Sequence, residues 1–482
     1  MMRFILFMTT MLLMHTIVFA QSSEDALRYS ARGNGSGSRA LGMGNAYIGV
    51  SDDYSAAVWN PAGLAQMRRL EMMGGISSTG LSNDATFFSA KQNASTSATS
   101  LDNIGFVFPF PTVQGSLVFA FGYSRIADYA STVKFEGFNS GSSIISSLYD
   151  SDVQYDIPFN TYLTNSAGYS AVQNNVNQRG VIKEGGNLGQ WSFAGAVDIE
   201  ENISFGVSLN VYSGMYDYTR NYVEEDTRNI YNNTAASLLK DSAYLRFNKF
   251  YYDSFLSSEL SGGNITLGMM YRSELYRVGL IAKGPTSIKV QETYINEGES
   301  VFDNNGGSWN TTNPAKKYSA PNSNNEYGVS SPWTFGAGGS LYIQPELLLA
   351  VDVDYVDWAQ IEWTDSPAME KKNTQLQSLF RSTVSYRIGA EFDIPTTEMR
   401  VRGGYSVTPS PYKNDPSTFD QTMFTGGIGI FLQRNVVLDG AFAYGSYKSF
   451  RNQYSIPGLA NASRTDESIT TTLVNFTVSY RF

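Results

Sequence analysis

The chain has 482 residues, a net charge of −10, 16% charged residues and 14% aromatic residues. Soluble proteins average about 25% charged residues. Cysteine is absent, which excludes disulfides, thiolate metal sites and cysteine nucleophiles. The single histidine, His15, lies in a segment that we expect to be removed, so His-dependent catalysis and His-ligated metals are excluded as well. The acidic balance argues against nucleic acid as a partner, because binding nucleic acid needs a basic surface.

The first twenty residues have the pattern of a secretory signal peptide. Arg3 is followed by an apolar run, and Val18 and Ala20 place short side chains at positions −3 and −1 of a cleavage point before Gln21. The run is too short for a membrane-spanning helix, which needs roughly 20 apolar residues. We therefore expect residues 1–20 to be cleaved on export.

The rest of the chain shows the alternation of a membrane β-barrel. In the last segment Val474, Phe476, Val478, Tyr480 and Phe482 share one face, and polar residues occupy the other. An apolar face toward lipid and a polar face toward the lumen is the pattern of a membrane strand. We predict an all-β fold, a transmembrane antiparallel barrel of about 14 strands over 69–482. The expected strands are 69–82, 101–110, 115–128, 187–199, 203–219, 258–272, 275–294, 327–343, 346–364, 379–393, 398–408, 420–432, 435–449 and 467–482.

The connections between these strands alternate in length. Short turns alternating with long outer loops, and an even number of strands, are typical of a bacterial outer-membrane barrel. A soluble β-sandwich explains the strands but not this alternation. We expect contacts with outer-membrane lipid and lipopolysaccharide, and the terminal Phe482 looks like the signal that barrel-assembly machinery recognises. The long connections are 83–100, 129–186, 220–257, 295–326, 365–378, 409–419 and 450–466.

Residues 21–68 have a different composition from the strands. Gly42 and Gly44 lie in a stretch rich in small residues. They do not complete a dinucleotide-binding motif, because Tyr47 takes the place of its third glycine and no strand precedes them. Small residues allow backbones to pack closely. We predict that 21–68 form a hatch, or plug, inside the lumen.

The hatch segment also resembles a known family. GMGNAYIGVSDDYSAAVWNPAGLA looks like the N-terminal hatch of the FadL/TodX family of outer-membrane transporters of hydrophobic compounds. Later blocks such as LAVDVDYVDWAQIEW and RVRGGYSVTPSPY follow in the family's order. The resemblance implies a fourteen-stranded barrel closed by a hatch. The positions that match the family's hatch, and that it implies for gating, are Gly42, Gly44, Asp52, Asp53, Asn60, Pro61 and Ala62.

The resemblance implies passive transport of hydrophobic compounds, such as long-chain fatty acids or aromatic hydrocarbons. The ligand would be captured among outer loops and would leave sideways, through a gap in the wall beside the Asn-Pro-Ala of the hatch. Sideways exit avoids releasing apolar surface into water, which costs roughly 25 cal/mol per Å². No enzymatic activity and no cofactor are expected. The alternative is an outer-membrane component of a protein-secretion or surface-assembly system, a role that relatives of this fold serve.

A gap in the wall requires a strand to lose pairing locally, and glycine or proline within a strand commonly marks such a place. Gly122 is the candidate for this kink and Pro109 is the second choice. Alternatively, Gly122 only fills a crowded position in the wall.

Three acidic residues, Asp352, Asp354 and Asp357, raise the question of a calcium site. Asp357 falls on the opposite strand face from the other two, and no EF-hand spacing is present. We expect no metal there, but lumen carboxylates that interact with Arg400 and Arg402.

Overall fold

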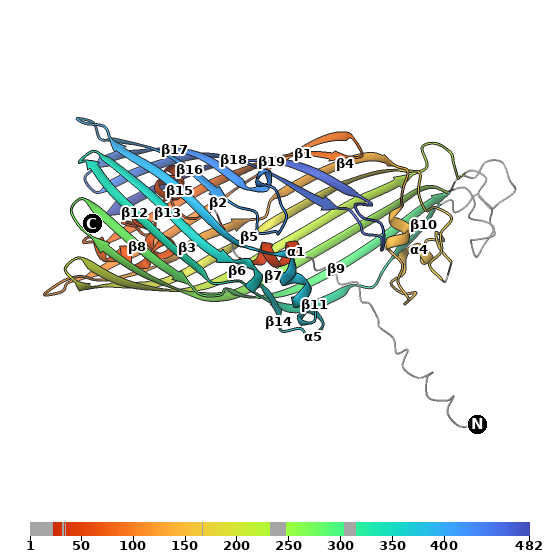
Figure 1. Cartoon of the computed structure of the whole chain (residues 1–482), viewed down its shortest axis with the longest axis horizontal. Helices are drawn as coiled ribbons and strands as arrows, with labels where there is room; N and C mark the ends of the chain where they lie inside the picture. Colours follow the sequence, from red (N-terminus) through yellow and green to blue (C-terminus); the bar gives the residue numbers. More distant parts are fainter. Residues whose placement is uncertain (1–22, 31–32, 34, 166, 232–246, 303–314) are drawn as a thin grey trace, which may run out of the picture.

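The computed structural model describes residues 23–30, 33, 35–165, 167–231, 247–302 and 315–482. The predicted signal peptide, 1–20, lies outside the described residues. After residue 70 most of the described chain is strand, and neighbouring strands run antiparallel around a closed wall (Figure 1). The wall closes where β1 pairs with β19, from Glu71 opposite Arg481 to Phe87 opposite Thr465. The predicted all-β transmembrane barrel is confirmed.

Nineteen strand segments build this wall, and some are pieces of one interrupted strand. Counting β3–β4, β8–β9, β10–β12 and β13–β14 as single strands gives the predicted 14 among the described residues. The segments are β1 (Glu71–Phe87), β2 (Ala90–Phe110), β3 (Leu117–Asp128), β4 (Ser131–Asn139), β5 (Val176–Glu200), β6 (Ile203–Glu225), β7 (Phe247–Arg272), β8 (Tyr276–Lys283), β9 (Ser287–Phe302), β10 (Ala315–Ser319), β11 (Ser323–Ser330), β12 (Thr334–Gln344), β13 (Leu347–Asp357), β14 (Glu362–Thr364), β15 (Ser382–Asp393), β16 (Met399–Thr408), β17 (Gln421–Gln433), β18 (Val436–Asn452) and β19 (Arg464–Arg481).

Proline accounts for three of the interruptions. Pro285 separates β8 from β9, Pro321 separates β10 from β11, and Pro332 separates β11 from β12. Proline has no N–H for the ladder, so a strand commonly breaks at it. The wall continues across each break because the pieces share neighbours; β7, for example, pairs with both β8 and β9.

The outer ends of many strands extend further than the sequence predicts. β1 and β2 fill most of 83–100, which we expected to be a loop, and β5 begins at Val176 rather than near 187. On β6 the outward residues change from Leu209 and Val211 to Asp217 and Asn221. Asp217 accepts a hydrogen bond from Ser257 on β7. Above the apolar belt both faces of a strand carry polar residues, so the alternation that revealed the strands is lost there.

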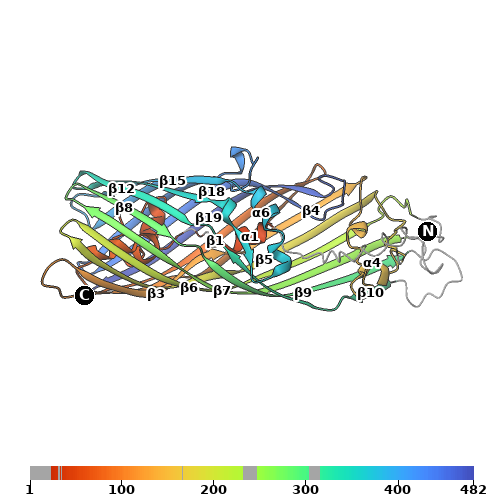
Figure 2. The ribbon, with the colours of Figure 1, turned by 60° about the horizontal axis from the view of Figure 1, so that its bottom comes forward.

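The hatch lies within the barrel. Its helices follow one another between the N-terminal segment and β1, and the red segment lies inside the wall in both ribbon views (Figures 1 and 2). Among the described residues, no helix has the length and apolarity needed to cross a membrane. The helices are α1 (Ser23–Tyr29), α2 (Ser38–Gly42), α3 (Ala56–Trp59), η1 (Pro61–Gln66), η2 (Ile144–Ser147), α4 (Ile157–Asn160), η4 (Trp358–Gln360), α5 (Pro367–Glu370), α6 (Asn373–Leu379) and η5 (Ser417–Phe419).

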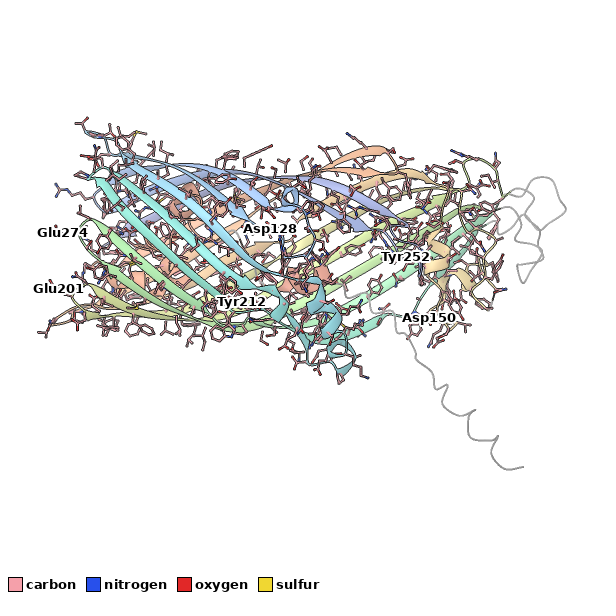
Figure 3. All side chains as sticks on the ribbon, viewed as in Figure 1. Asp128, Asp150, Glu201, Tyr212, Tyr252 and Glu274 are labelled. Atoms are coloured by element: carbon pink, nitrogen blue, oxygen red, sulfur yellow. The ribbon has the colours of Figure 1, made fainter. Side chains whose placement is uncertain are left out.

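The two ends of the barrel differ. Glu201 and Glu274 mark the end with short turns, while Asp150 and Tyr252 lie toward the end with long connections (Figure 3). Buried apolar side chains from several strands and loops pack together at this outer end, including Phe135, Tyr222 and Phe250. This packing fills part of the outer end, while α2 and η1 of the hatch pack against wall strands such as β6 and β18.

Candidate functional site

The wall has a break in backbone pairing between β2 and the strand formed by β3 and β4. The β2–β3 ladder runs from Phe110 opposite Leu117 to Asn103 opposite Ser124. Residues 90–102 pair on their other side with β1, and β4 pairs with β5. In the described chain, no ladder joins residues 90–102 to residues 125–139. We call this boundary the seam.

A β-bulge stands on each strand where the seam begins. The β1–β2 register shifts so that Asp102 is the extra residue of β2. The β3–β5 register shifts so that Ile126 is the extra residue of β3. A bulge bends its strand and increases the local twist, and the two bulges stand where the pairing between β2 and β3 ends.

The seam begins at the outer border of the lipid-facing belt. On β2 the outward side chains Leu101, Ile104 and Phe108 are apolar and exposed. Further out, the outward positions are polar, as at Ser97 and Thr99. An exit at the seam would therefore lead into the outer part of the bilayer.

Cavities lie on both sides of the seam. On the lumen side a cavity of about 310 Å³ is lined by Ser77, Asp102 and Ile126, among others. On the lipid side a hollow of about 240 Å³ is lined by residues such as Leu101 and Trp191. The side chain of Arg125 lines both of them.

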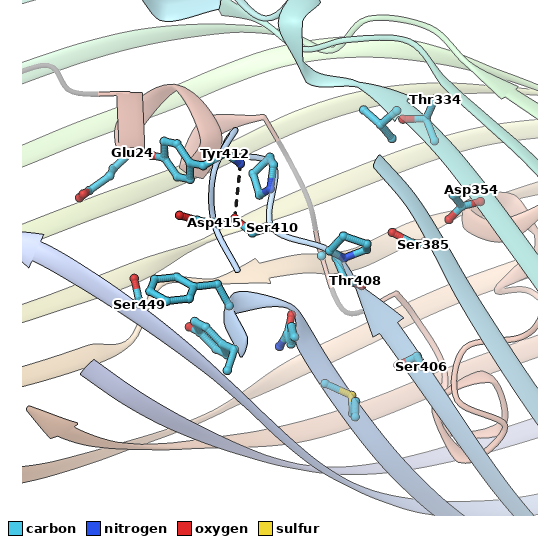
Figure 4. A pocket seen from close by; sticks show the side chains of 18 of the residues that line it. Glu24, Thr334, Asp354, Ser385, Ser406, Thr408, Ser410, Tyr412, Asp415 and Ser449 are labelled. Carbon is cyan, nitrogen blue, oxygen red and sulfur yellow. Dashed lines mark hydrogen bonds between the residues drawn. The ribbon is translucent and has the colours of Figure 1, made fainter. Parts of the chain in front are cut away.

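A larger lumen cavity, of about 840 Å³, adjoins the lumen side of the seam. It shares Gly33, Gly35 and Ile126 with the smaller cavity. Hydroxyl and charged groups line much of it, and Figure 4 shows Tyr412 and Glu24 among them. Because the two cavities share lining residues, they form adjoining space that extends from the outer loops to the seam.

Close backbone contacts fix the first part of the hatch to the wall. Gly44 has a φ of 66°, and a Cβ on it would lie 2.7 Å from the backbone nitrogen of Tyr405. A Cβ on Gly42 would already lie within 3.3 Å of Gly427 and Arg402 in the wall (3.2 Å from the Cα of Gly427). The small residues singled out in the sequence therefore permit hatch and wall to touch.

Charged groups fix the hatch as well. Arg39 forms an ion pair with Asp52 within the hatch and a two-pronged pair with Glu391 of β15, with both N–O distances 2.8 Å. Asp52 also pairs with Arg277 of β8 at 3.3 Å. Asp53 has an internal role instead, because its carboxylate accepts hydrogen bonds from the Tyr47 hydroxyl and from the Ser55 backbone.

Asn60, Pro61 and Ala62 contact β6 and β7. Asn60 Nδ2 donates to the backbone oxygen of Met269, and its Oδ1 accepts from the Ala62 N–H. A Cβ on Gly206 would lie 2.3 Å from the carbonyl carbon of Pro61. The family resemblance implied that Asn-Pro-Ala lies beside the gap in the wall. Here it lies against β6 and β7, whereas the pairing gap is between β2 and β3–β4.

Gly122 has a packing role in this structure. It is paired in register with Gly105 on one side and Ser192 on the other. Cβ atoms on Gly105 or Gly122 would lie within 2.5 Å of the hatch residue Tyr54. Pairing also continues at Pro109, which stands opposite Val118. A kink at Gly122 stays a prediction, while the register shift of β3 lies further along, at Ile126.

The acidic residues of β13 have partners other than those expected. Asp354 forms an ion pair with Arg387, and Asp352 accepts from the backbone N–H groups of Tyr47 and Ile48. In the described residues no group of acidic side chains is arranged to hold a metal. Asp357 accepts from the N–H of Ala359 at the start of η4. Arg400 and Arg402 instead pair with Glu391, Asp393 and Asp439.

The comparison with protein families supplies the last observation. Residues 259–482 match the family described as outer membrane protein transport protein (OMPP1/FadL/TodX). The predicted resemblance is confirmed, and with it the location in the bacterial outer membrane. The FadL/TodX family consists of outer-membrane transporters of hydrophobic compounds rather than enzymes.

Solved structures of FadL/TodX proteins share the fold over nearly the whole chain. A Pseudomonas aeruginosa FadL homologue superimposes with a TM-score of 0.56 at 10% identity, covering 93% of this chain and 98% of that one. The Pseudomonas putida toluene transporter TodX gives 0.54 at 10% identity, covering 93% and 99%. No curated protein matches the sequence. These likenesses concern the fold.

The seam of this barrel was not predicted from the sequence. Its one sequence signal is a change of phase in β2, where the outward apolar residues pass from Leu101 to Ile104, three positions on, instead of two. That step marks the bulge at Asp102. Arg125 lines the cavities on both sides of the seam. The sequence does not single it out, because arginines are common on lumen faces.

Proposed function

We propose that this protein carries hydrophobic compounds, long-chain fatty acids or aromatic hydrocarbons, passively into the outer membrane. A ligand captured among the outer loops enters the lumen cavity and leaves sideways between β2 and β3–β4. One observation carries this proposal: a stretch of wall without backbone pairing lies between a lumen cavity and a hollow on the lipid face. The toluene transporter TodX has a similar fold, which agrees with this choice of ligand class.

The hatch supports the sideways route by closing the straight one. Its seven predicted residues belong to a segment bound to the wall through ion pairs and close backbone contacts. We propose that the hatch controls passage by keeping the barrel closed toward the periplasm, so that a solute has to leave through the seam. An apolar solute then reaches the bilayer without crossing water, where its exposed surface would cost roughly 25 cal/mol per Å².

Cross-linking the seam tests the exit route. The chain has no cysteine, so Asp102→Cys and Ile126→Cys, the two bulge residues that line the same lumen-side cavity, can be joined across the seam by a short bifunctional maleimide. Uptake of radiolabelled oleate and of radiolabelled toluene, measured in cells that lack their own FadL-type transporters, should fall strongly after cross-linking. The pair acts on the seam only, because the ladder below it is intact.

The control is Phe106→Cys with Phe121→Cys, which stand opposite each other in the intact β2–β3 ladder. Cross-linking there joins strands that are already paired and should leave uptake unchanged. Uptake of both probes at the uncross-linked rate after the seam is joined would refute lateral exit at this place.

A further inference from the structure

We infer that Arg125 is the latch that holds the seam closed in the resting protein, an inference that rests on the proposed lateral exit. Arg125 belongs to β3 and stands directly after Ser124, the last residue of that strand paired with β2. Its side chain therefore occupies the place where the next rung of the ladder would be.

The guanidinium joins three strands. Nη1 donates to Ser100 Oγ of β2 at 2.6 Å, and Nη2 donates to Ser77 Oγ of β1 at 2.5 Å. Nη1 also pairs with Asp128 of its own strand at 2.6 Å. Arg125 is 7% exposed, so these contacts are made in a nearly closed site. Side-chain hydrogen bonds thus replace the backbone pairing that is missing.

Arg125 also stands in the path between the two cavities. Among the described residues, it is the one that lines both the lumen-side cavity and the hollow on the lipid face. A solute moving between them has to displace this side chain. Contact with an apolar solute would desolvate the charged guanidinium without replacing its hydrogen bonds, which costs free energy. The closed latch therefore opposes passage.

Arg125 has neutral partners across the seam and a charged partner on its own strand, and this arrangement favours reversible opening. The bonds that cross the seam go to neutral serine hydroxyls, whereas the charged partner, Asp128, lies on the same strand. Bonds to neutral acceptors are weaker than bonds between charged groups. The guanidinium can release both serines and remain paired with Asp128, so opening does not leave a bare charge in the wall.

The test reports on the seam itself and needs no transport. A bimane fluorophore on Leu81→Cys, in the lumen-side cavity, is placed in vesicles of brominated phosphatidylcholine, whose acyl chains quench it on contact. We expect little quenching in the otherwise unchanged protein. Quenching should rise when Arg125→Ala is added, and equally when Ser77→Ala and Ser100→Ala are added together, since these remove only the bonds across the seam.

The control is Arg179→Ala, which removes an arginine from the polar outer wall, where it pairs with Glu225. Heat-dependent migration on gels checks that each barrel folds, and if Arg125→Ala does not fold, the double serine variant decides. Unchanged quenching in the folded serine variant overturns the latch. Increased quenching with unchanged oleate and toluene uptake would establish the latch and refute lateral exit.

Discussion

At the scale of single residues, Arg39 links the hatch to the wall through charged groups. It pairs with Asp52 and Glu391, and all three side chains are largely buried. Removing one partner of a buried pair costs about 3–5 kcal/mol when the remaining charge is uncompensated. Here Arg277 still faces Asp52 and Arg402 still faces Glu391. The cost should therefore be smaller than in the uncompensated case.

We predict that Arg39→Ala destabilises the docked hatch by about 2–3 kcal/mol, the worth of its charged hydrogen bonds. Hydrogen exchange of hatch peptides within 38–66 should accelerate accordingly, while the barrel strands keep their protection. The comparison variant is Arg68→Ala, whose side chain is 61% exposed and lies 3.6 Å from Asp198. An exposed pair of this kind is worth about 1 kcal/mol at most. Equal effects of the two variants would contradict the anchoring role.

Asp156 gives the outer loops a dependence on pH. Its carboxylate accepts from the N–H of Phe159 at the start of α4, in the connection between β4 and β5. Burial raises the pKa of Asp156 from 3.8 to about 6. A raised pKa means that the folded loop holds the proton more tightly than the unfolded one, so its stability is highest below about pH 4 and falls as pH rises through about 6.

Limited proteolysis of the 140–165 region should therefore be slower at pH 4 than at pH 7. Asp156→Asn keeps an acceptor at the helix start, because asparagine is an equally good N-cap, and it cannot titrate. The difference between wild type and this variant isolates the Asp156 contribution. If both lose protection in parallel between pH 4 and 7, another group is responsible.

At the scale of elements, the docking of η1 depends on glycines of the wall. A Cβ on Gly268 of β7 would lie 2.2 Å from Asn60 Oδ1 and 2.9 Å from Pro61 Cδ. We predict that Gly268→Val displaces η1 and costs about 1–3 kcal/mol, the usual range for overpacking. Faster hydrogen exchange in peptides covering 56–66 would show the displacement.

Gly74→Val on β1 provides the matched substitution, since a Cβ there meets nothing within 4 Å. It should leave the exchange of 56–66 unchanged. Similar exchange in the two valine variants would mean that the wall glycines do not position the Asn-Pro-Ala block.

The sequence predicts elements well wherever one face of a strand meets lipid. Val474, Phe476 and Val478 of β19 show the alternation clearly, and all fourteen strands were found in this way. The sequence does not predict which position of the wall contacts which residue of the hatch. Asn60 and Gly268 are far apart in the chain, and their contact follows only from the closed barrel. A kink at Gly122 stays a prediction; in the structure, glycine there makes room for Tyr54, and the two register shifts occur at Asp102 and Ile126, residues without special composition.

At the scale of the whole molecule, the wall is much taller on one side than on the other. β5, β6 and β7 have 25, 23 and 26 residues, whereas β15, β16 and β17 have 12, 10 and 13. A membrane strand needs about 9–11 residues. The short strands therefore end close to the bilayer surface, while more than half of each long strand stands above it with a polar exterior.

The position of the seam also sets a thermodynamic limit. On the proposed passive route, a solute that leaves there is still in the outer part of the bilayer, and only its own concentration gradient drives its passage. Such a protein acts as a catalyst of partitioning. The final membrane content is fixed by the partition coefficient of the solute, and more copies of the protein would only shorten the time needed to reach it. Net inward flow then has to be maintained by consumption of the compound inside the cell.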